Sequence, residues 1–258
     1  MVGQEPVSTT LRHAVAAGTP AHAYLFTGPR GTGKTSTGRI LAKAVNCERP
    51  VEGEPCNECI SCVSYDEGRS LDLIELDAAS NRGIDEIRDL RESAGYSPTA
   101  GRFKVYLIDE VHMLTDAAFN ALLKTLEEPP SHVKFVLCTT EPEKLPITIL
   151  SRCQRFDFTT VDTGSIAGRL AQIVEAEGVD VTPEALTLIA RRAAGSMRDS
   201  QSLLEQLLGG AAGPIGVDDV HAIIGTGREE KVGQLVAAIA DRDPRRALLA
   251  LHLSLIHI

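Results

Sequence analysis

The sequence has no apolar run that approaches the roughly 20 residues needed to cross a bilayer. Its N-terminus also lacks the charged and then apolar layout of a signal peptide. Both absences favour a chain that stays in the cytoplasm. Positive charge is scarce as well: 26 lysines and arginines face 35 acidic residues, for a net charge of −9. This balance argues against a protein wrapped in nucleic acid, although a local basic face can still contact a phosphate backbone.

Cysteine is limited to six residues. In a reducing compartment six cysteines indicate metal ligands or buried thiols rather than disulfides. With 258 residues and 43% hydrophobic content, the chain can form one large or two modest cores, and we expect at least two domains.

The most informative stretch is Gly-Pro-Arg-Gly-Thr-Gly-Lys-Thr at 28–35, which fits the phosphate-binding pattern G-x-x-x-x-G-K-[ST]. A short apolar run at 23–27 precedes it and helical spacing at 35–45 follows, as a P-loop requires. Backbone N–H groups would surround phosphate oxygens, Lys34 would reach the β- and γ-phosphates, and Thr35 would bind Mg²⁺. The alternative is a glycine-rich turn that binds nothing. The predicted nucleotide-binding residues are Gly28, Pro29, Arg30, Gly31, Thr32, Gly33, Lys34, Thr35 and Ser36.

A second predicted part of the site is the apolar strand at 105–108, which ends in Asp109 and Glu110. Asp109 would hold Mg²⁺ and Glu110 would orient and polarise the attacking water. The alternative is a strand that runs into a solvated acidic turn. Because the strand follows a P-loop, the pair predicts ATP hydrolysis as well as binding.

Four cysteines lie within sixteen residues directly after the P-loop helix, in the pattern C-x8-C-x2-C-x2-C. They suit a closed tetrahedral zinc site of structural type, and the alternative is a group of reduced buried thiols. Cys138 and Cys153 are interpreted as core residues. The predicted zinc ligands are Cys47, Cys56, Cys59 and Cys62.

The order of elements predicts the fold class. Strands at 71–76, 105–108, 133–138 and 156–158 alternate with helical patterns, so the first 160 residues are expected to be α/β, a parallel sheet with helices on both faces. One intervening helix has Thr115 as its predicted N-cap and ends before Pro129. Helical spacing at 163–177, 183–194, 197–208 and 217–224 predicts a small all-helical domain, and a further helical segment begins at Thr226.

Two arginines stand out by position. Arg152, in Ser-Arg-Cys at 151–153, is predicted at a domain edge and aimed at a neighbour, although by itself it reads as a surface arginine. Arg198 opens a helix of the second domain, where it can reach phosphate or pair with an acid.

Taken together, these motifs resemble the AAA+ ATPases, and among them the gamma/tau family of clamp-loader subunits of bacterial DNA polymerase III. The resemblance extends from Val2 to about Arg246. It is carried by the P-loop, the four-cysteine insertion and Ser-Arg-Cys, together with the runs at 77–81, 107–114 and 121–130.

The resemblance implies roles that composition cannot assign. Thr140 would be the first sensor near the γ-phosphate, and Arg198 the second, linking the helical lid to nucleotide. Arg152 would be the arginine finger that completes the ATP site of the adjacent subunit. The segment 80–82 would touch the DNA backbone without reading bases.

The resemblance also implies a working cycle and partners. ATP would favour an assembly that opens the sliding clamp, and primed DNA would trigger hydrolysis and closure. The partners would be other loader subunits in a hetero-oligomeric ring, the clamp and primer-template DNA. Polymerase core and helicase would be held only by C-terminal regions beyond this chain.

Domain limits follow from the same likeness. They are an AAA+ domain at 1–160 with a zinc module at 47–62, a helical lid at 161–225, and the start of a helical collar at 226–252. The tail at 253–258 resembles a translated sequencing adapter. Family members begin further upstream with a basic, proline-containing segment that helps enclose adenine, so we expect weakened adenine binding here.

Two alternatives stay open. One is another AAA+ DNA-processing ATPase of the branch-migration helicase type, which shares the P-loop and the sensors. The other is a non-hydrolysing clamp-loader scaffold that uses Arg152 only in trans. A polymerase is not indicated, because no paired metal-binding aspartates lie in a suitable setting.

Overall fold

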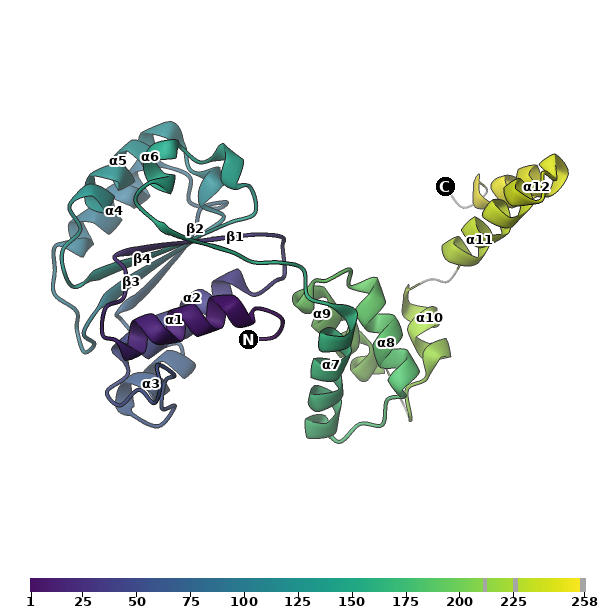
Figure 1. Ribbon diagram of the computed structural model, residues 1–258, viewed down its shortest axis with the longest axis horizontal. Helices are drawn as coiled ribbons and strands as arrows, with labels where there is room; N and C mark the ends of the chain where they lie inside the picture. Colours follow the sequence, from purple (N-terminus) through teal and green to yellow (C-terminus); the bar gives the residue numbers. More distant parts are fainter. Residues whose placement is uncertain (211–212, 225–226, 256–258) are drawn as a thin grey trace. The chain divides into compact units, whose positions relative to one another are not determined.

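A five-stranded, fully parallel sheet forms the centre of the first structural unit of the computed structural model (Figure 1). The structure describes residues 1–210, 213–224 and 227–255. The strand order of the sheet is β2-β3-β4-β1-β5, so the connections between successive strands cross over the sheet. The strands are β1 (Ala23–Thr27), β2 (Leu73–Asp77), β3 (Lys104–Asp109), β4 (Val133–Thr139) and β5 (Gln154–Asp157).

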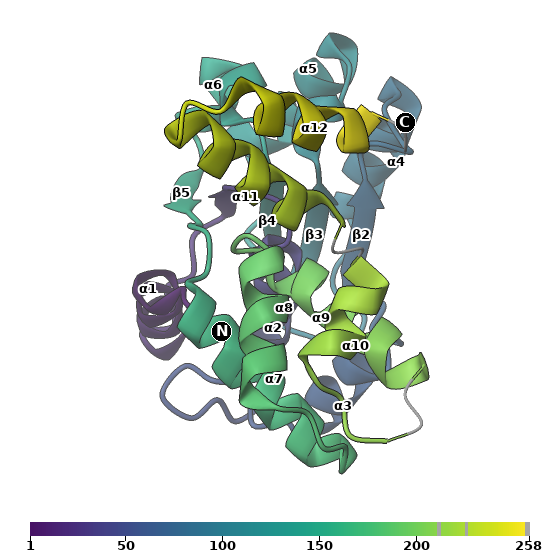
Figure 2. The same cartoon turned by 90° about the vertical axis from the view of Figure 1, so that its right-hand side faces the viewer.

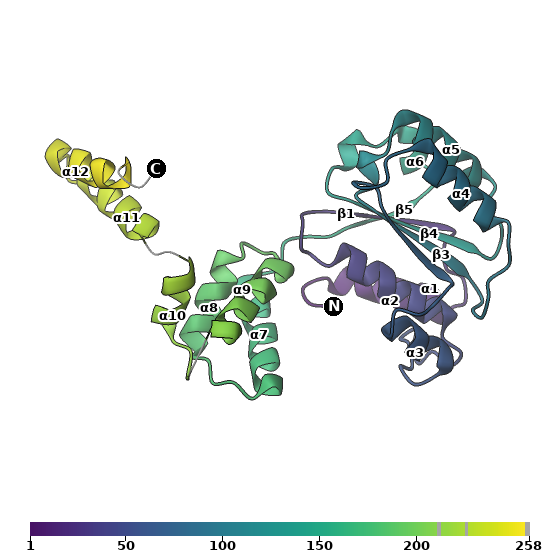
Figure 3. The same ribbon diagram turned by 180° about the vertical axis from the view of Figure 1, so that it is seen from behind.

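Helices cover both faces of this sheet, as predicted. Helices α1, α2 and α3 lie on one face and α4, α5 and α6 on the other (Figures 1 and 3). Side chains of β1 alternate between two cores: Tyr24 and Phe26 pack with α1 and α2, and Leu25 with α4 and α5. Burial on both faces explains why β1 is a continuous run of buried, mostly apolar residues rather than an alternating pattern. The helices on the two faces are α1 (Glu5–Ala16), α2 (Lys34–Asn46), α3 (Ile60–Asp66), α4 (Ile84–Ala94), α5 (Asp116–Glu127) and α6 (Ile147–Leu150), with short 3₁₀ turns η1 (Val111–Met113) and η2 (Pro142–Lys144).

The observed strand limits lie within two residues of the predicted ones, and those of β1 coincide with the prediction. The predicted first residue of β2, Leu71, is 72% exposed and outside the strand. Asp72, which breaks the apolar pattern, is buried because three backbone N–H groups donate to its carboxylate. Thr115 caps α5 as predicted, since its side chain accepts from the Ala118 backbone N–H.

The second unit is helical. Compact unit one contains Met1–Ile166 and Ala194–Asp199, and unit two contains Ala167–Ala193 and Ser200–Ile258. Within unit two, α8 packs against α10, and Val181 bridges Ile215 (Figure 2). Helix α8 ends two residues earlier than predicted, and Ala194 has a φ of 48°. The helices are α7 (Thr163–Glu177), α8 (Pro183–Arg192), α9 (Met197–Gly210), α10 (Val217–Ile224), α11 (Gly227–Ala240) and α12 (Pro244–Leu255).

Two further sequence predictions, on the C-terminal tail and on membrane spans, can be compared with the described residues. The predicted tail at 253–258 falls partly within α12, and its last three residues lie outside the described part of the chain. Among the residues that the structure describes, no helix is both long and apolar enough to span a membrane.

Candidate nucleotide site and metal centre

The residues of the predicted nucleotide site lie at one edge of the sheet. Strands β1, β3 and β4 are parallel, so their carboxyl ends meet at the same edge. Strand β4 lies between β1, which leads into the P-loop, and β3, which ends at Asp109. The residue after β4, Thr140, is therefore placed between the two halves of the site. Ligands of open parallel sheets bind at this kind of edge.

The loop between β1 and α2 depends on its glycines. Gly31 and Gly33 have φ angles of 76° and 97°, which residues with a Cβ rarely adopt. A Cβ at Gly31 would also collide with the Ser196 hydroxyl. The Gly31 carbonyl accepts from the backbone N–H groups of Met197 and Arg198, at 3.0 and 3.4 Å. The first turn of α9 therefore closes against the loop.

Lys34 is buried at the first residue of α2. Its Nζ donates to the carbonyls of Gly28 and Pro29, each at 2.7 Å. Burial lowers the pKa of Lys34, and the nearby Glu110 and Asp109 carboxylates oppose that shift. The ammonium is thus held inside the loop by partners that a phosphate oxygen can replace.

Thr35 and Asp109 form the candidate magnesium position. Thr35 Oγ1 donates to Asp109 Oδ2 at 2.7 Å, although the two residues lie 74 positions apart in sequence. A hydroxyl and a carboxylate are the oxygen donors that Mg²⁺ takes when phosphate and water supply its other ligands. The donor set therefore fits this cation.

Glu110 and Thr140 are brought together beside this pair. Glu110 Oε2 accepts from Thr140 Oγ1 at 3.1 Å and from the Thr140 backbone N–H at 3.4 Å. The Glu110 backbone lies in the left-handed region, with a φ of 46°. This conformation is uncommon for glutamate and turns the residue away from the path of β3.

Three residues that sequence reasoning did not single out complete this edge. His112 Nδ1 lies 3.0 Å from Thr139 Oγ1, and His112 Nε2 lies 3.1 Å from Glu141 Oε1. Thr139 is the last residue of β4 and Glu141 follows shortly after it. All three residues lie at or just after the end of a strand. That position indicates a shared site only once β3 and β4 are known to be neighbours.

The two predicted arginines occupy different surroundings. Arg152 donates to Glu127 Oε1 and to the Thr148 carbonyl, both at 2.8 Å, so it contacts α5 and α6 rather than the P-loop of its own chain. Arg198 is exposed and lies beside the P-loop through its backbone contact with Gly31. Of the remaining predicted loop residues, Thr32 is buried and donates to the Pro29 carbonyl, whereas Arg30 and Ser36 are exposed.

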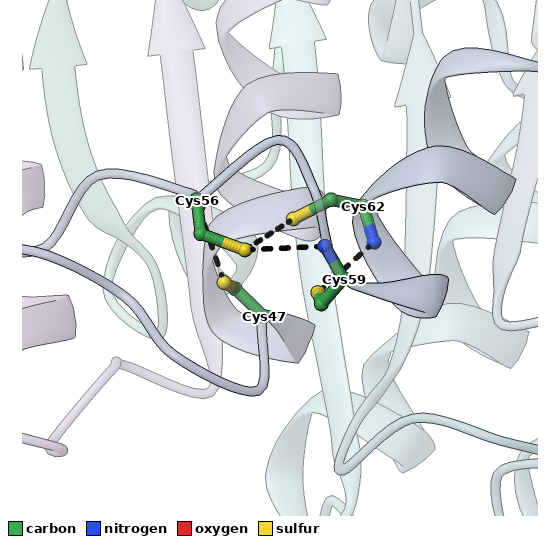
Figure 4. A group of neighbouring side chains, drawn as sticks. All are labelled: Cys47, Cys56, Cys59 and Cys62. Atoms are coloured by element: carbon green, nitrogen blue, oxygen red, sulfur yellow. Dashed lines mark hydrogen bonds between the residues drawn. The ribbon is translucent and has the colours of Figure 1, made fainter.

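The four predicted zinc ligands gather into one cluster at the far end of α2 (Figure 4). Their sulfur atoms all lie within 4.8 Å of one another, and those of Cys56 and Cys62 are 4.0 Å apart. Zn–S bonds of about 2.3 Å in a tetrahedron place sulfur atoms about 3.8 Å apart, so the cluster fits a four-thiolate metal site. Cys138 is fully buried and Cys153 is half-buried, as expected of core residues.

Backbone N–H groups point at the sulfurs of this cluster. The Cys56, Cys59 and Cys62 amides donate to the sulfurs of Cys47, Cys56 and Cys59 at 3.3 to 3.4 Å. The backbone N–H groups of Glu58 and Cys59 lower the pKa of Cys56 to about 6, whereas burial raises the pKa of Cys62 to about 12. A cation in the cluster would deprotonate both thiols, because the thiolate is the metal-binding form.

Comparison with known families agrees with this geometry. Residues 3–162 match the family model described as DNA polymerase III, delta subunit, and residues 165–213 match that of the DNA polymerase III clamp loader subunit, ATPase lid domain. Solved structures of Thermotoga maritima RuvB, a Holliday junction branch migration motor, superpose with a TM-score of 0.66 at 18% identity over 92% of this chain and 76% of theirs. That likeness shows a shared AAA+ fold.

Full-length relatives are more similar in sequence. DNA polymerase III subunit tau of Bacillus subtilis is 50% identical over 98% of this chain and 45% of its own length. The Escherichia coli subunit tau is 48% identical over 96% of this chain and 39% of its length, so the chain spans less than half of these relatives. Subunit gamma of Buchnera aphidicola from Acyrthosiphon pisum is 41% identical, and the match covers 98% of this chain and 70% of the relative. With the P-loop, the paired carboxylates and the cysteine cluster in place, the chain belongs to the gamma/tau family of DNA polymerase III clamp-loader subunits.

Proposed function

We propose that this chain is an ATP-driven motor of a bacterial clamp loader, which binds and hydrolyses ATP to open a sliding clamp and place it on primed DNA. The observation that carries the proposal is the meeting of Lys34, Asp109, Glu110 and Thr140 at one sheet edge, in a chain of this family. Such a protein works in the cytoplasm, with other loader subunits, the clamp and primer-template DNA as partners.

Nucleotide binding is assigned to Gly28–Ser36. The N-terminus of α2 favours anions, and the glycine conformations let backbone N–H groups approach phosphate oxygens. Lys34 would exchange its two carbonyl partners for β- and γ-phosphate oxygens. Thr35 and Asp109 would hold Mg²⁺, which supplies charge neutralisation between the phosphates.

Hydrolysis is assigned to Glu110 and Thr140. Glu110 would orient and polarise the attacking water, because its carboxylate lies next to the Asp109 position without sharing the contact to Thr35. Thr140 would contact the γ-phosphate and act as the sensor. Its hydrogen bond to Glu110 would link the presence of that phosphate to the residue that polarises the attacking water. Arg198 would report nucleotide to the helical lid from its place beside Gly31.

Arg152 is assigned as the finger for a neighbouring subunit. Its partners in this chain, Glu127 and Thr148, lie on α5 and α6, which supports a role outside its own P-loop. The ion pair between Arg152 and Glu127 is half-exposed, so breaking it to reach a neighbouring subunit would cost little free energy. Stabilising charge in the neighbour's transition state is typically worth about 10³ to 10⁵ in rate.

Two further assignments complete the proposal. The cysteine cluster would hold a structural zinc ion, since four thiolates leave no open position for catalysis. Ser80 and Arg82, exposed after β2, would touch the DNA backbone. The domain limits follow as 1–160 for the ATPase domain, 161–225 for the lid and 226–252 for the beginning of a collar.

The first test is steady-state ATP hydrolysis by this chain assembled with the other loader subunits, clamp and primed DNA. Clamp and DNA should stimulate the native chain. Lys34→Ala should lose nucleotide binding, whereas Arg152→Ala should keep binding and lose stimulation. Arg155→Ala is the matched control, because Arg155 is exposed on the edge strand β5, its ion pair in the described part of the chain is with Asp157, and it is given no role. Turnover that ignores the clamp or survives loss of Arg152 would refute the loader function.

A further inference from the structure

An imidazole lies between two carboxylates beside the nucleotide site. The His112 side chain is only 5% exposed, with Nδ1 3.4 Å from Glu110 Oε2 and Nε2 3.1 Å from Glu141 Oε1. His112 belongs to η1, directly after β3, whereas Glu141 follows β4. The ring therefore connects the segment that carries Glu110 to the segment that leads on to α6.

Both nitrogens of this ring are fixed. Glu141 is anchored on its other oxygen by Lys144, whose Nζ lies 2.6 Å from Oε2, and this hydrogen bond lowers the pKa of Glu141. An ionised carboxylate can only accept, so Nε2 of His112 carries a proton and donates to Glu141. Nδ1 is then the acceptor of the ring: it lies 3.0 Å from the Thr139 hydroxyl, which can donate to it while Thr139 Oγ1 accepts from the Glu141 backbone N–H. The network closes on itself and sets the plane of the imidazole.

The Glu110 carboxylate is held asymmetrically. Among the described residues, the hydrogen bonds from Thr140 fall on Oε2, and the His112 ring packs against the same oxygen, with Nδ1 at 3.4 Å. Oε1 is then the oxygen that can accept a proton from water. Because the Glu110 backbone is in an uncommon conformation, the surrounding side chains have to hold this orientation.

We propose that His112 is a positioning residue for Glu110, and that Glu141 in turn fixes His112. The inference rests on the ATPase activity proposed above. It goes beyond that activity because the orientation of the Glu110 carboxylate then depends on residues 139–144. His112 itself touches neither nucleotide nor water in this scheme. Its loss should therefore slow the chemical step and leave ATP affinity in place.

The test uses the assembled loader with clamp and primed DNA, and compares His112→Ala, Glu141→Gln and His112→Gln. We expect kcat to fall on the order of 10- to 100-fold in His112→Ala, with a smaller loss in Glu141→Gln, as misplaced reacting groups generally cause. The dissociation constant for ATP, measured by calorimetry, should stay at the native value. His112→Gln should recover part of kcat, because its amide N–H can still donate to Glu141.

Two comparisons separate positioning from general damage. His132→Asn removes a half-buried histidine at the opposite edge of the same sheet, where its Nε2 contacts the Ala94 carbonyl, and should leave kcat native. In a Glu110→Gln background, adding His112→Ala should cause no further loss, because His112 acts only through Glu110.

The outcomes are distinguishable. Native kcat in both His112→Ala and Glu141→Gln would overturn the proposal, and so would a further loss in the Glu110→Gln background. If native turnover depends on Lys34 and His112→Ala is unaffected, only this inference fails. If native turnover is absent or independent of Lys34, the proposed ATPase function fails with it.

Discussion

Helix α2 has a different candidate site at each end. At its N-terminus Lys34 donates to carbonyls of its own loop, and Thr35 donates to Asp109. At its C-terminus Asn46 bonds to Tyr65 and to both backbone groups of Phe103, and the next residue, Cys47, joins the cysteine cluster. The contacts at the N-terminal end can be exchanged for contacts to a ligand. The contacts at the C-terminal end join parts of the fold to one another and stay in place.

This difference indicates a division of labour along one helix. A site that works in cycles needs contacts of modest strength, because each of them would have to break when the proposed nucleotide binds. The cysteine module is instead joined to the end of α2 by the hydrogen bond from Asn46 to Tyr65 of α3, and Asn46 also holds the loop before β3 through Phe103. Changes at the two ends should therefore affect different quantities: turnover at one end and stability at the other.

The largest expected effect is on stability at the C-terminal end. Cys62→Ser, or removal of metal by a chelator, should lower the free energy of unfolding by about 3 kcal/mol or more, because the module has little core of its own. Urea unfolding together with metal analysis measures this. Equal stability before and after chelation, with no metal released, would leave the cluster as reduced thiols.

The next effect is on turnover at the N-terminal end. Lys34→Ala should reduce ATP hydrolysis by about 100-fold or more, equivalent to about 2.7 kcal/mol, while stability changes little because a buried ammonium is costly. Nucleotide titration and thermal unfolding of the same preparation test both halves. A large fall in stability with intact binding would reverse the roles of the two ends.

Asp72 gives a smaller, pH-dependent effect near the C-terminal end. Burial opposes ionisation of Asp72, but the N–H groups of Thr99, Ala100 and Gly101 more than offset it, and its pKa is lowered. A lowered pKa in the folded state stabilises the fold above the unfolded pKa of about 3.9, and that contribution is lost as pH falls through the folded value.

Asp72→Asn should therefore cost about 2 kcal/mol at pH 7, and the difference from native should shrink below about pH 4. Urea unfolding at several pH values measures both quantities. A difference that stays constant down to acid pH would mean that the carboxylate charge does not matter.

The smallest effect is expected in the middle of α2. Arg39 makes two hydrogen bonds to Glu75, at 2.7 and 2.8 Å, but both side chains are substantially exposed. Glu75→Gln should change stability by less than about 1 kcal/mol, and added salt should reduce the difference further. The same unfolding measurement at low and high salt checks it, and a cost comparable to that of Asp72→Asn would argue that the whole helix, not its ends, is the sensitive element.

Local patterns predicted much of this arrangement. The run into the P-loop, the helix after it and the acidic end of β3 could be recognised because each is a contiguous segment with its own spacing. The convergence of the four cysteines was also predictable, since all lie within sixteen residues. In these cases local chemistry and fold agree.

Contacts that depend on strand order could not be predicted in the same way. His112, Thr139 and Glu141 meet only because β4 lies beside β3, and no local spacing encodes that neighbour relation. The start of β2 was misplaced because hydropathy favours an exposed Leu71 and penalises a buried Asp72, whose charge is satisfied by backbone donors from residues 99–101. Tertiary hydrogen bonds override the local pattern there.

The most direct test of the proposed function is ATP-dependent transfer of a ring-shaped clamp onto primed circular DNA by a loader assembled with this chain. Native chain should load the clamp, and Lys34→Ala and Arg152→Ala should fail while still assembling. Loading that proceeds equally with native chain, Lys34→Ala and Arg152→Ala would contradict the assignment of this chain as the motor.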